Sequence, residues 1–191
     1  MDNDVSAGST TTSTLGHLAL GLTLLAFGLG NTGVIDHVAA ADTSALATWV
    51  GGVALFTTGL LALRAGDGGE GTAFAGLGAF WFTWGTAVGG GASAEASGLF
   101  LLVWSLLALT LTVSAKGGGL MGQGVYGLLF LSLLSSGVGA FAEAGVLTKA
   151  GGWAAALAGL AAWYGATATV AKWPTLANRS AGRSPGVTAT G

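Results

Sequence analysis

The side chains that could do chemistry in this sequence are few, mostly uncharged and set within apolar stretches. Asn31 stands out because it lies in a glycine-rich break, Gly28-Leu29-Gly30-Asn31-Thr32-Gly33. Its amide cannot be fully satisfied by its own helical turn, so it can line a solute pathway, cap the helix or bond to a neighbouring helix. Similar neutral hydroxyl, amide and indole groups recur along the chain at Thr23, Thr57, Thr58, Thr72, Trp81, Trp84, Trp104, Ser105, Gln123, Tyr126, Ser132, Ser135, Ser136 and Tyr164. Such groups suit weak recognition of a small solute.

Constellations for catalysis or tight metal binding are missing from the sequence. It contains no Cys, which excludes disulfides, thiolate metal sites and a Cys nucleophile. His17 has no second His or Glu within helical reach, which favours an interfacial residue over a metal ligand or proton relay. No nucleophile is paired with a base. We therefore expect no enzyme activity, no metal and no cofactor.

The fractions of hydrophobic and charged residues indicate whether this chain folds in water or in a lipid bilayer. Of its 191 residues, 52% are hydrophobic and only 7% are charged, and the mean hydropathy is +0.73. A soluble domain usually has about a quarter of its residues charged. A net charge of −2 without a basic cluster excludes nucleic acid as a partner. The sequence predicts an integral membrane protein whose main partner is the lipid bilayer.

Six apolar stretches are long enough to cross the membrane. A bilayer core of about 30 Å needs roughly 20 helical residues, and the stretches that meet this length are about Leu15–Ile35, Ala45–Leu63, Thr72–Gly90, Ala96–Ala115, Leu120–Ala142 and Gly151–Ala171. This predicts an all-α bundle of six transmembrane helices. We expect a disordered cytoplasmic tail at 1–14, a six-helix transmembrane domain at 15–172 and a cytoplasmic C-terminal tail at 173–191.

The distribution of cations predicts the orientation. With six spans, one side of the membrane carries Arg64, Lys116, Lys172, Arg179 and Arg183. Only Lys149 lies on the opposite side, together with Asp36, Asp42, Glu95 and Glu143. Because cytoplasmic loops are enriched in Lys and Arg, both termini are predicted to be cytoplasmic.

Small residues recur at every fourth position in two of the spans. The third span has Gly71, Ala75, Ala79, Thr83 and Ala87, and the sixth has Ala154, Ala158, Ala162 and Ala166. Small residues let helix backbones approach closely in lipid. Such seams can pack one bundle or join protomers, and the spacing leaves both interpretations open.

Several motifs in the membrane domain resemble one known family. The runs Gly51-Gly52-Val53-Ala54, Gly59-Leu60-Leu61, Gly71-Thr72-Ala73-Phe74 and Gly78-Ala79-Phe80-Trp81 resemble the second and third helices of the acetate uptake transporter family, which includes the bacterial succinate–acetate permease and fungal acetate transporters. Further positions in the same order are Leu15-Gly16, Asn31 with Gly33, Gln123, and Gly151-Gly152-Trp153 with Ala162 and Tyr164. The resemblance covers about Leu15 to Pro174.

This resemblance implies a hexamer in the plasma membrane with a solute pathway through each protomer. The pathway would carry acetate, with other short carboxylates as further candidates, by a channel or a proton-coupled mechanism. By alignment, the family's apolar constriction falls on Leu20, Leu77 and Leu129, where many members have an aromatic residue at the first two positions. The sequence also lacks the prolines that usually precede Leu15-Gly16 in the family.

The predicted pathway therefore consists of Leu20, Asn31, Thr72, Leu77, Trp81, Gln123, Leu129, Ala162 and Tyr164. Two other functions remain open from the residues alone. A neutral lining serves equally well for urea, an amide, ammonia or water. A structural or signalling membrane protein would use the small-residue seams only for assembly.

Overall fold

The structure, a computed structural model, describes residues 2–115 and 120–173, and every regular element in that part of the chain is a helix. This confirms the predicted all-α class. The long helices are α1 (Asp2–Thr32), α4 (Gly68–Gly89), α5 (Ala94–Ser114), α6 (Leu120–Phe141) and α7 (Gly145–Val170). A further rod consists of the short helix η1 (Ala40–Thr43), α2 (Ser44–Leu46), the π-helical segment η2 (Ala47–Ala54) and α3 (Leu55–Arg64).

Among the described residues, four segments are long and apolar enough to cross a membrane: Thr11–Thr32, Ala41–Arg64, Ala94–Ser114 and Met121–Phe141. The predicted third and sixth spans correspond to α4 and α7, which are helical over comparable lengths but are rich in Gly and Ala. These small side chains contribute less hydropathy than the leucines of α5. The structure thus defines a multi-pass membrane protein.

The first helix begins earlier than the apolar pattern indicates. Residues 2–14, which the sequence predicts as a disordered tail, continue α1 as a regular helix. No proline interrupts this segment, so the backbone hydrogen-bond ladder can extend beyond the apolar stretch. Of the predicted C-terminal tail, only Trp173 is described, and 174–191 lie outside the described residues, as do residues 116–119 with Lys116.

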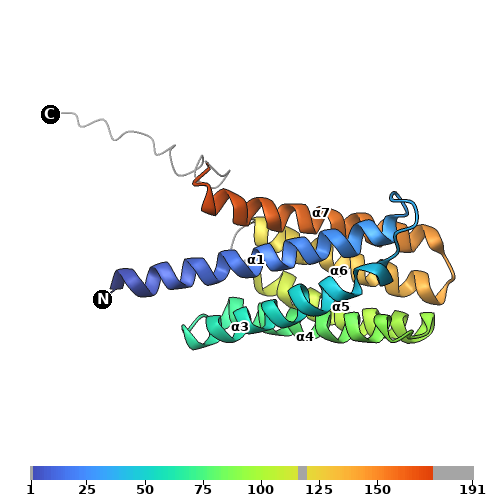
Figure 1. Cartoon of the computed structure of the whole chain (residues 1–191), viewed down its shortest axis with the longest axis horizontal. Coiled ribbons are helices and arrows are strands. Elements are labelled where there is room, and N and C mark those ends of the chain that lie inside the picture. The colour runs from blue at the N-terminus through green and yellow to red at the C-terminus, as the bar shows by residue number, and fades with distance from the viewer. Residues whose placement is uncertain (1, 116–119, 174–191) are drawn as a thin grey trace.

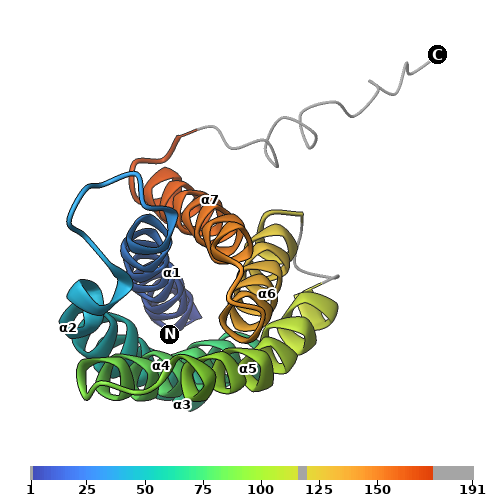
Figure 2. The same cartoon turned by 90° about the vertical axis from the view of Figure 1, so that its right-hand side faces the viewer.

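The helices form a ring when the bundle is seen end on (Figure 2). Its neighbours in order are α1, α7, α6, α5, α4 and α3, and α3 closes the ring by packing on α1. α1, α4 and α6 run in one direction along the bundle, and α3, α5 and α7 run in the other (Figure 1). The beginning of α1 and the end of α7 therefore lie at the same end of the bundle.

Glycines set the distance between the two most extensively packed helices, α1 and α7. A Cβ atom on Gly28 would lie 2.5 Å from the backbone nitrogen of Ala156 and 2.7 Å from the carbonyl oxygen of Gly152. One heptad earlier, a Cβ on Gly21 would lie 2.8 Å from the backbone nitrogen of Trp163. No real side chain tolerates such contacts, so glycine at these positions is what permits the backbone-to-backbone packing.

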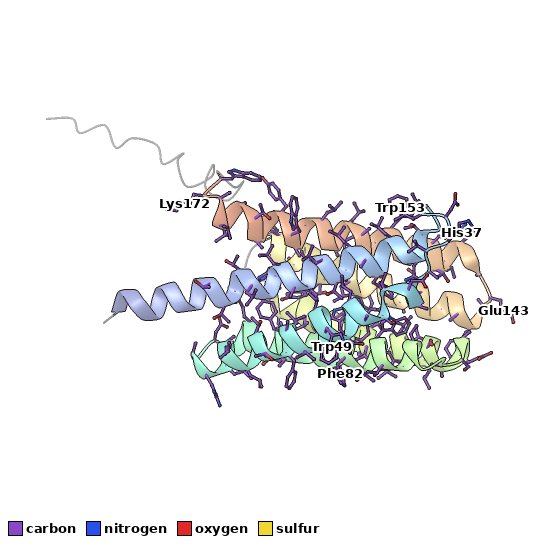
Figure 3. The ribbon with its side chains drawn as sticks, in the orientation of Figure 1. His37, Trp49, Phe82, Glu143, Trp153 and Lys172 are labelled. Atoms are coloured by element: carbon purple, nitrogen blue, oxygen red, sulfur yellow. The ribbon has the colours of Figure 1, made fainter. Side chains whose placement is uncertain are left out.

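Large apolar side chains cover the outside of the bundle. Trp49, Phe82 and Trp153 project outward (Figure 3), with exposed fractions of 66, 45 and 49%. An exposed apolar surface of this kind is expected where lipid replaces water. Lys172 lies at the end where the described chain begins and ends, whereas His37 and Glu143 lie near the opposite end (Figure 3).

The glycine packing of α1 on α7 can be tested by adding one methyl group. Gly28→Ala forces the two backbones apart and should lower the unfolding free energy by about 1–3 kcal/mol, the usual range for overpacking. The measurement is thermal unfolding of the purified protein in detergent. Gly124→Ala is the matched control, because a Cβ there meets nothing within 4 Å. Equal melting temperatures for the two variants would contradict the packing role.

Candidate functional site

Three leucines from three helices close the centre of the bundle. Leu20 on α1, Leu77 on α4 and Leu129 on α6 are fully buried, with exposed fractions of 0, 1 and 0%, and belong to one apolar cluster. We call these three residues the leucine layer. Because α1, α4 and α6 run in parallel, residues one turn earlier on each helix lie together on one side of the layer.

A cavity of about 620 Å³ opens on that side of the leucine layer. Its lining includes His17, Ala73 and Val125, which precede Leu20, Leu77 and Leu129 by one helical turn on their respective helices. Tyr126 and Ala162 also line it. The leucine layer therefore lies directly beyond the inner end of this cavity, which we call the vestibule.

The mouth of the vestibule carries the carboxylates of Asp67 and Glu70. Asp67 caps the start of α4, since its Oδ1 accepts a hydrogen bond of 2.9 Å from the backbone N–H of Glu70. Ser13 on α1 donates its hydroxyl to Glu70 Oε1 at 2.6 Å, and the Ser13 carbonyl accepts from Nδ1 of His17 at 2.8 Å. The Ser13–Glu70 bond connects α1 to the beginning of α4.

Beyond the leucine layer, three buried polar atoms have no hydrogen-bond partner in the described part of the chain: Trp81 Nε1, Ser132 Oγ and Ser136 Oγ. Trp81 follows Leu77 by one turn, and Ser132 follows Leu129 in the same way. A buried polar atom without a partner is unfavourable in the absence of a ligand or water. These atoms are therefore the best candidates for contacts with a solute that has passed the leucines.

Gly51 in the π-helical segment η2 makes room for Trp81. A Cβ on Gly51 would lie 2.8 Å from Cγ of Trp81 and 2.9 Å from Oγ1 of Thr23, so only glycine fits there. Aromatic rings surround the indole, with Phe27 and Phe80 at centroid distances of 5.4 and 4.6 Å. Single π-helical turns often occur at functional sites.

The structure brings part of the predicted pathway together. Leu20, Leu77, Leu129 and Trp81 are buried in one cluster, and Ala162 lines the vestibule. Asn31 is half-buried and donates Nδ2 to the Phe27 carbonyl at 2.9 Å, and Gln123 is half-buried on α6.

Two of the predicted pathway residues lie elsewhere. Thr72 is exposed on α4, and Tyr164 is 39% exposed on α7, with its ring 6.4 Å from that of Trp173. The predicted pathway does not include Ser132, Ser136, Glu70 or Tyr126. Ser132 and Ser136 share a face of α6 with Leu129 by their spacing, and that signal was available.

The described residues contain no group of three or more His, Cys, Asp or Glu side chains able to hold a metal ion. What the site offers is a polar vestibule, an apolar closure and buried neutral donors beyond it. These features are typical of membrane proteins of the transport class.

Comparisons with known proteins identify the family. The family model described as the GPR1/FUN34/yaaH family matches residues 6–176, and the chain belongs to this family of acetate transporters. It is consequently a transport protein and not an enzyme, as predicted. Among solved structures, the fold is similar to that of the bacterial acetate channel SatP, with a TM-score of 0.76 and 24% sequence identity over 84% of this chain and 92% of that one. No curated protein matches the chain.

The unpartnered hydroxyl of Ser132 gives a prediction about stability. Ser132→Ala removes a buried polar atom that has no partner, so the unfolding free energy should stay the same or rise. Ser105→Ala is the matched control, because Ser105 is equally buried but donates to the Leu102 carbonyl at 2.7 Å. Loss of this Ser105 hydrogen bond should lower the unfolding free energy by about 0.5–1.5 kcal/mol. Thermal unfolding in detergent compares the two variants. A larger loss of unfolding free energy in Ser132→Ala than in Ser105→Ala would mean that the Ser132 hydroxyl has a hydrogen-bond partner in the folded protein.

Proposed function

We propose that this protein transports acetate across the plasma membrane along a path through its own helix bundle. The observation that carries the proposal is the leucine layer, fully buried and placed between an open vestibule and a set of unpartnered polar atoms. The family and the likeness to the acetate channel SatP support acetate as the solute. Other short carboxylates are candidates for the same path.

The chemistry of the path fits a small carboxylic solute. Methyl and short alkyl groups can pass a ring of leucine side chains, which opposes hydrated ions because it offers them no replacement for water. Beyond the ring, the indole N–H of Trp81 and the hydroxyls of Ser132 and Ser136 can donate to a carboxyl oxygen. Neutral donors bind weakly, which permits rapid release.

A channel for a small neutral solute is the second candidate function. The same hydroxyl and indole groups can bind urea, an amide, ammonia or water, and the leucine layer does not discriminate against them by charge. Uptake of labelled acetate and of labelled urea by the same proteoliposomes separates the two functions.

We further propose six membrane spans, both termini in the cytoplasm and a hexameric assembly. The position of Lys172 at the end of the bundle where the described chain begins and ends, and of Glu143 near the opposite end, supports this orientation by the positive-inside rule. The hexamer rests on the family resemblance. Native mass spectrometry of the detergent-solubilised protein measures the number of protomers directly.

The leucine layer can be tested by changing its width. Leu77→Trp fills the constriction and adds an overpacking barrier of about 1–3 kcal/mol, which lowers acetate flux about five- to 160-fold. Leu129→Ala removes side-chain volume and should raise flux. The measurement is protein-dependent uptake of radiolabelled acetate into liposomes, with correct folding checked by gel filtration and thermal unfolding.

Leu106→Trp is the matched control, because Leu106 is 62% exposed on the outer face of α5. It should transport acetate at the wild-type rate. If Leu77→Trp and Leu106→Trp behave alike, the solute does not pass between these leucines. Absence of protein-dependent acetate uptake in the wild type would instead remove acetate as the solute.

The role of Asn31 is tested separately. We propose that its amide contributes to the path, and Asn31→Ala should then lower acetate flux about two- to tenfold, the equivalent of one net hydrogen bond. Stability should change little, since its hydrogen bond is to its own helix. Thr110→Ala, an exposed residue with a comparable bond to its own helix, is the control. Unchanged flux in Asn31→Ala would limit this residue to a structural role.

A further inference from the structure

The charge of the vestibule is unusual for a path that is proposed to carry a carboxylate. Asp67 and Glu70 line its mouth, and no Lys or Arg is among its described lining residues. The other titratable groups that face it are His17 from α1 and Tyr126 from α6. The parts of α5 and α7 that line it contribute only apolar and hydroxyl side chains. An acetate anion at the mouth would therefore meet negative charge.

Glu70 is held in position at the mouth rather than free to turn away. Its backbone N–H is bonded to Asp67 Oδ1 at 2.9 Å, and its Oε1 accepts from Ser13 at 2.6 Å. Both it and Asp67 are half-buried, where charges interact more strongly than in open water. An ionised carboxylate only accepts hydrogen bonds, so Glu70 presents an acceptor to whatever enters.

Tyr126 supplies the complementary group. Only 8% of its surface is exposed, and it lines the same vestibule as Glu70. A phenolic hydroxyl can donate a hydrogen bond to an acceptor atom. Its position in the vestibule therefore allows Tyr126 to donate to a carbonyl oxygen of a solute there.

We propose that the vestibule selects the undissociated carboxylic acid over the carboxylate anion, with Glu70 as the specificity-determining residue and Tyr126 as a donor to the solute. This inference rests on the proposed function. A neutral carboxyl group has an O–H that donates to Glu70 and a C=O that accepts from Tyr126. A carboxylate ion has only acceptor oxygens, so it leaves Glu70 unmatched and is repelled by it. No covalent step is involved.

The selection can be measured through the charge that crosses with the solute. Radiolabelled acetate uptake into proteoliposomes is recorded at equal pH on both sides, with and without an inside-positive potassium diffusion potential of about 59 mV, which accumulates a monovalent anion tenfold. Wild-type uptake should be protein-dependent and unaffected by the potential, because the neutral acid carries no charge. In Glu70→Gln, where an amide N–H replaces one acceptor oxygen, the potential should raise acetate accumulation towards tenfold.

Two further variants separate this effect from a general loss of charge or of structure. Glu95→Gln removes the same charge from an exposed residue of α5 outside the vestibule and should stay insensitive to the potential. Tyr126→Phe should lower uptake about two- to tenfold, the equivalent of one hydrogen bond, without making it sensitive to the potential.

The outcomes distinguish this inference from the proposed function. If wild-type uptake is protein-dependent and already driven by the potential, the anion is the transported species, so the selection is wrong and acetate transport stands. That result does not depend on any variant folding. If Glu70→Gln is folded and remains insensitive to the potential, Glu70 is not the selecting residue. If the wild type gives no uptake above empty liposomes, both the proposed function and the selection fail.

Discussion

The close approach of α1 to α7 is the contact on which the rest of the bundle depends. In lipid, helices gain nothing by hiding apolar surface from water, and their association relies on close van der Waals packing. Gly21 and Gly28 on α1 lie against the backbone of α7, and Gly152 and Gly159 on α7 lie against that of α1. The paired glycines thereby fix the position of α1 in the ring and direct Leu20 towards the leucines of α4 and α6.

This arrangement leaves the large side chains to fill the centre. α4 carries Leu77 and Trp81 inward, while glycines on both sides of the contact let α3 and η2 approach it from outside. Gly78 of α4 lies against Phe56 of α3, and Gly52 of η2 lies against Phe82 of α4. An apolar layer then separates two polar regions of different character. One contains carboxylates and is open, and the other contains neutral donors and is closed. Because the two regions differ, different groups can control the entry of a solute and its passage along the proposed path.

Much of the fold could be predicted from the sequence because the bilayer imposes a length and an apolar composition on each span. Five of the six apolar stretches coincide with one long helix each, and the second coincides with the rod of α2, η2 and α3. Two of the breaks between them coincide with the capped helix starts at Asp67 and Ser93. The start of α1 could not be predicted, since the polar composition of 2–14 does not require helix. The π-helical segment η2 likewise has no periodicity of its own, because it depends on how Gly51 packs against Trp81 and Thr23.

The sequence by itself determined the class of the protein, the number and position of its apolar stretches, the family and, through alignment, the three leucines. These properties follow from composition and local spacing, which the chain carries without folding. Only the tertiary structure decided that Glu70, Ser13 and Tyr126 meet in one vestibule, that Ser132 and Ser136 are left without partners, and that Thr72 and Tyr164 are exposed. Each of these facts depends on the rotation of one helix against another. Rotation is set by backbone contact between residues far apart in sequence, which no local pattern records.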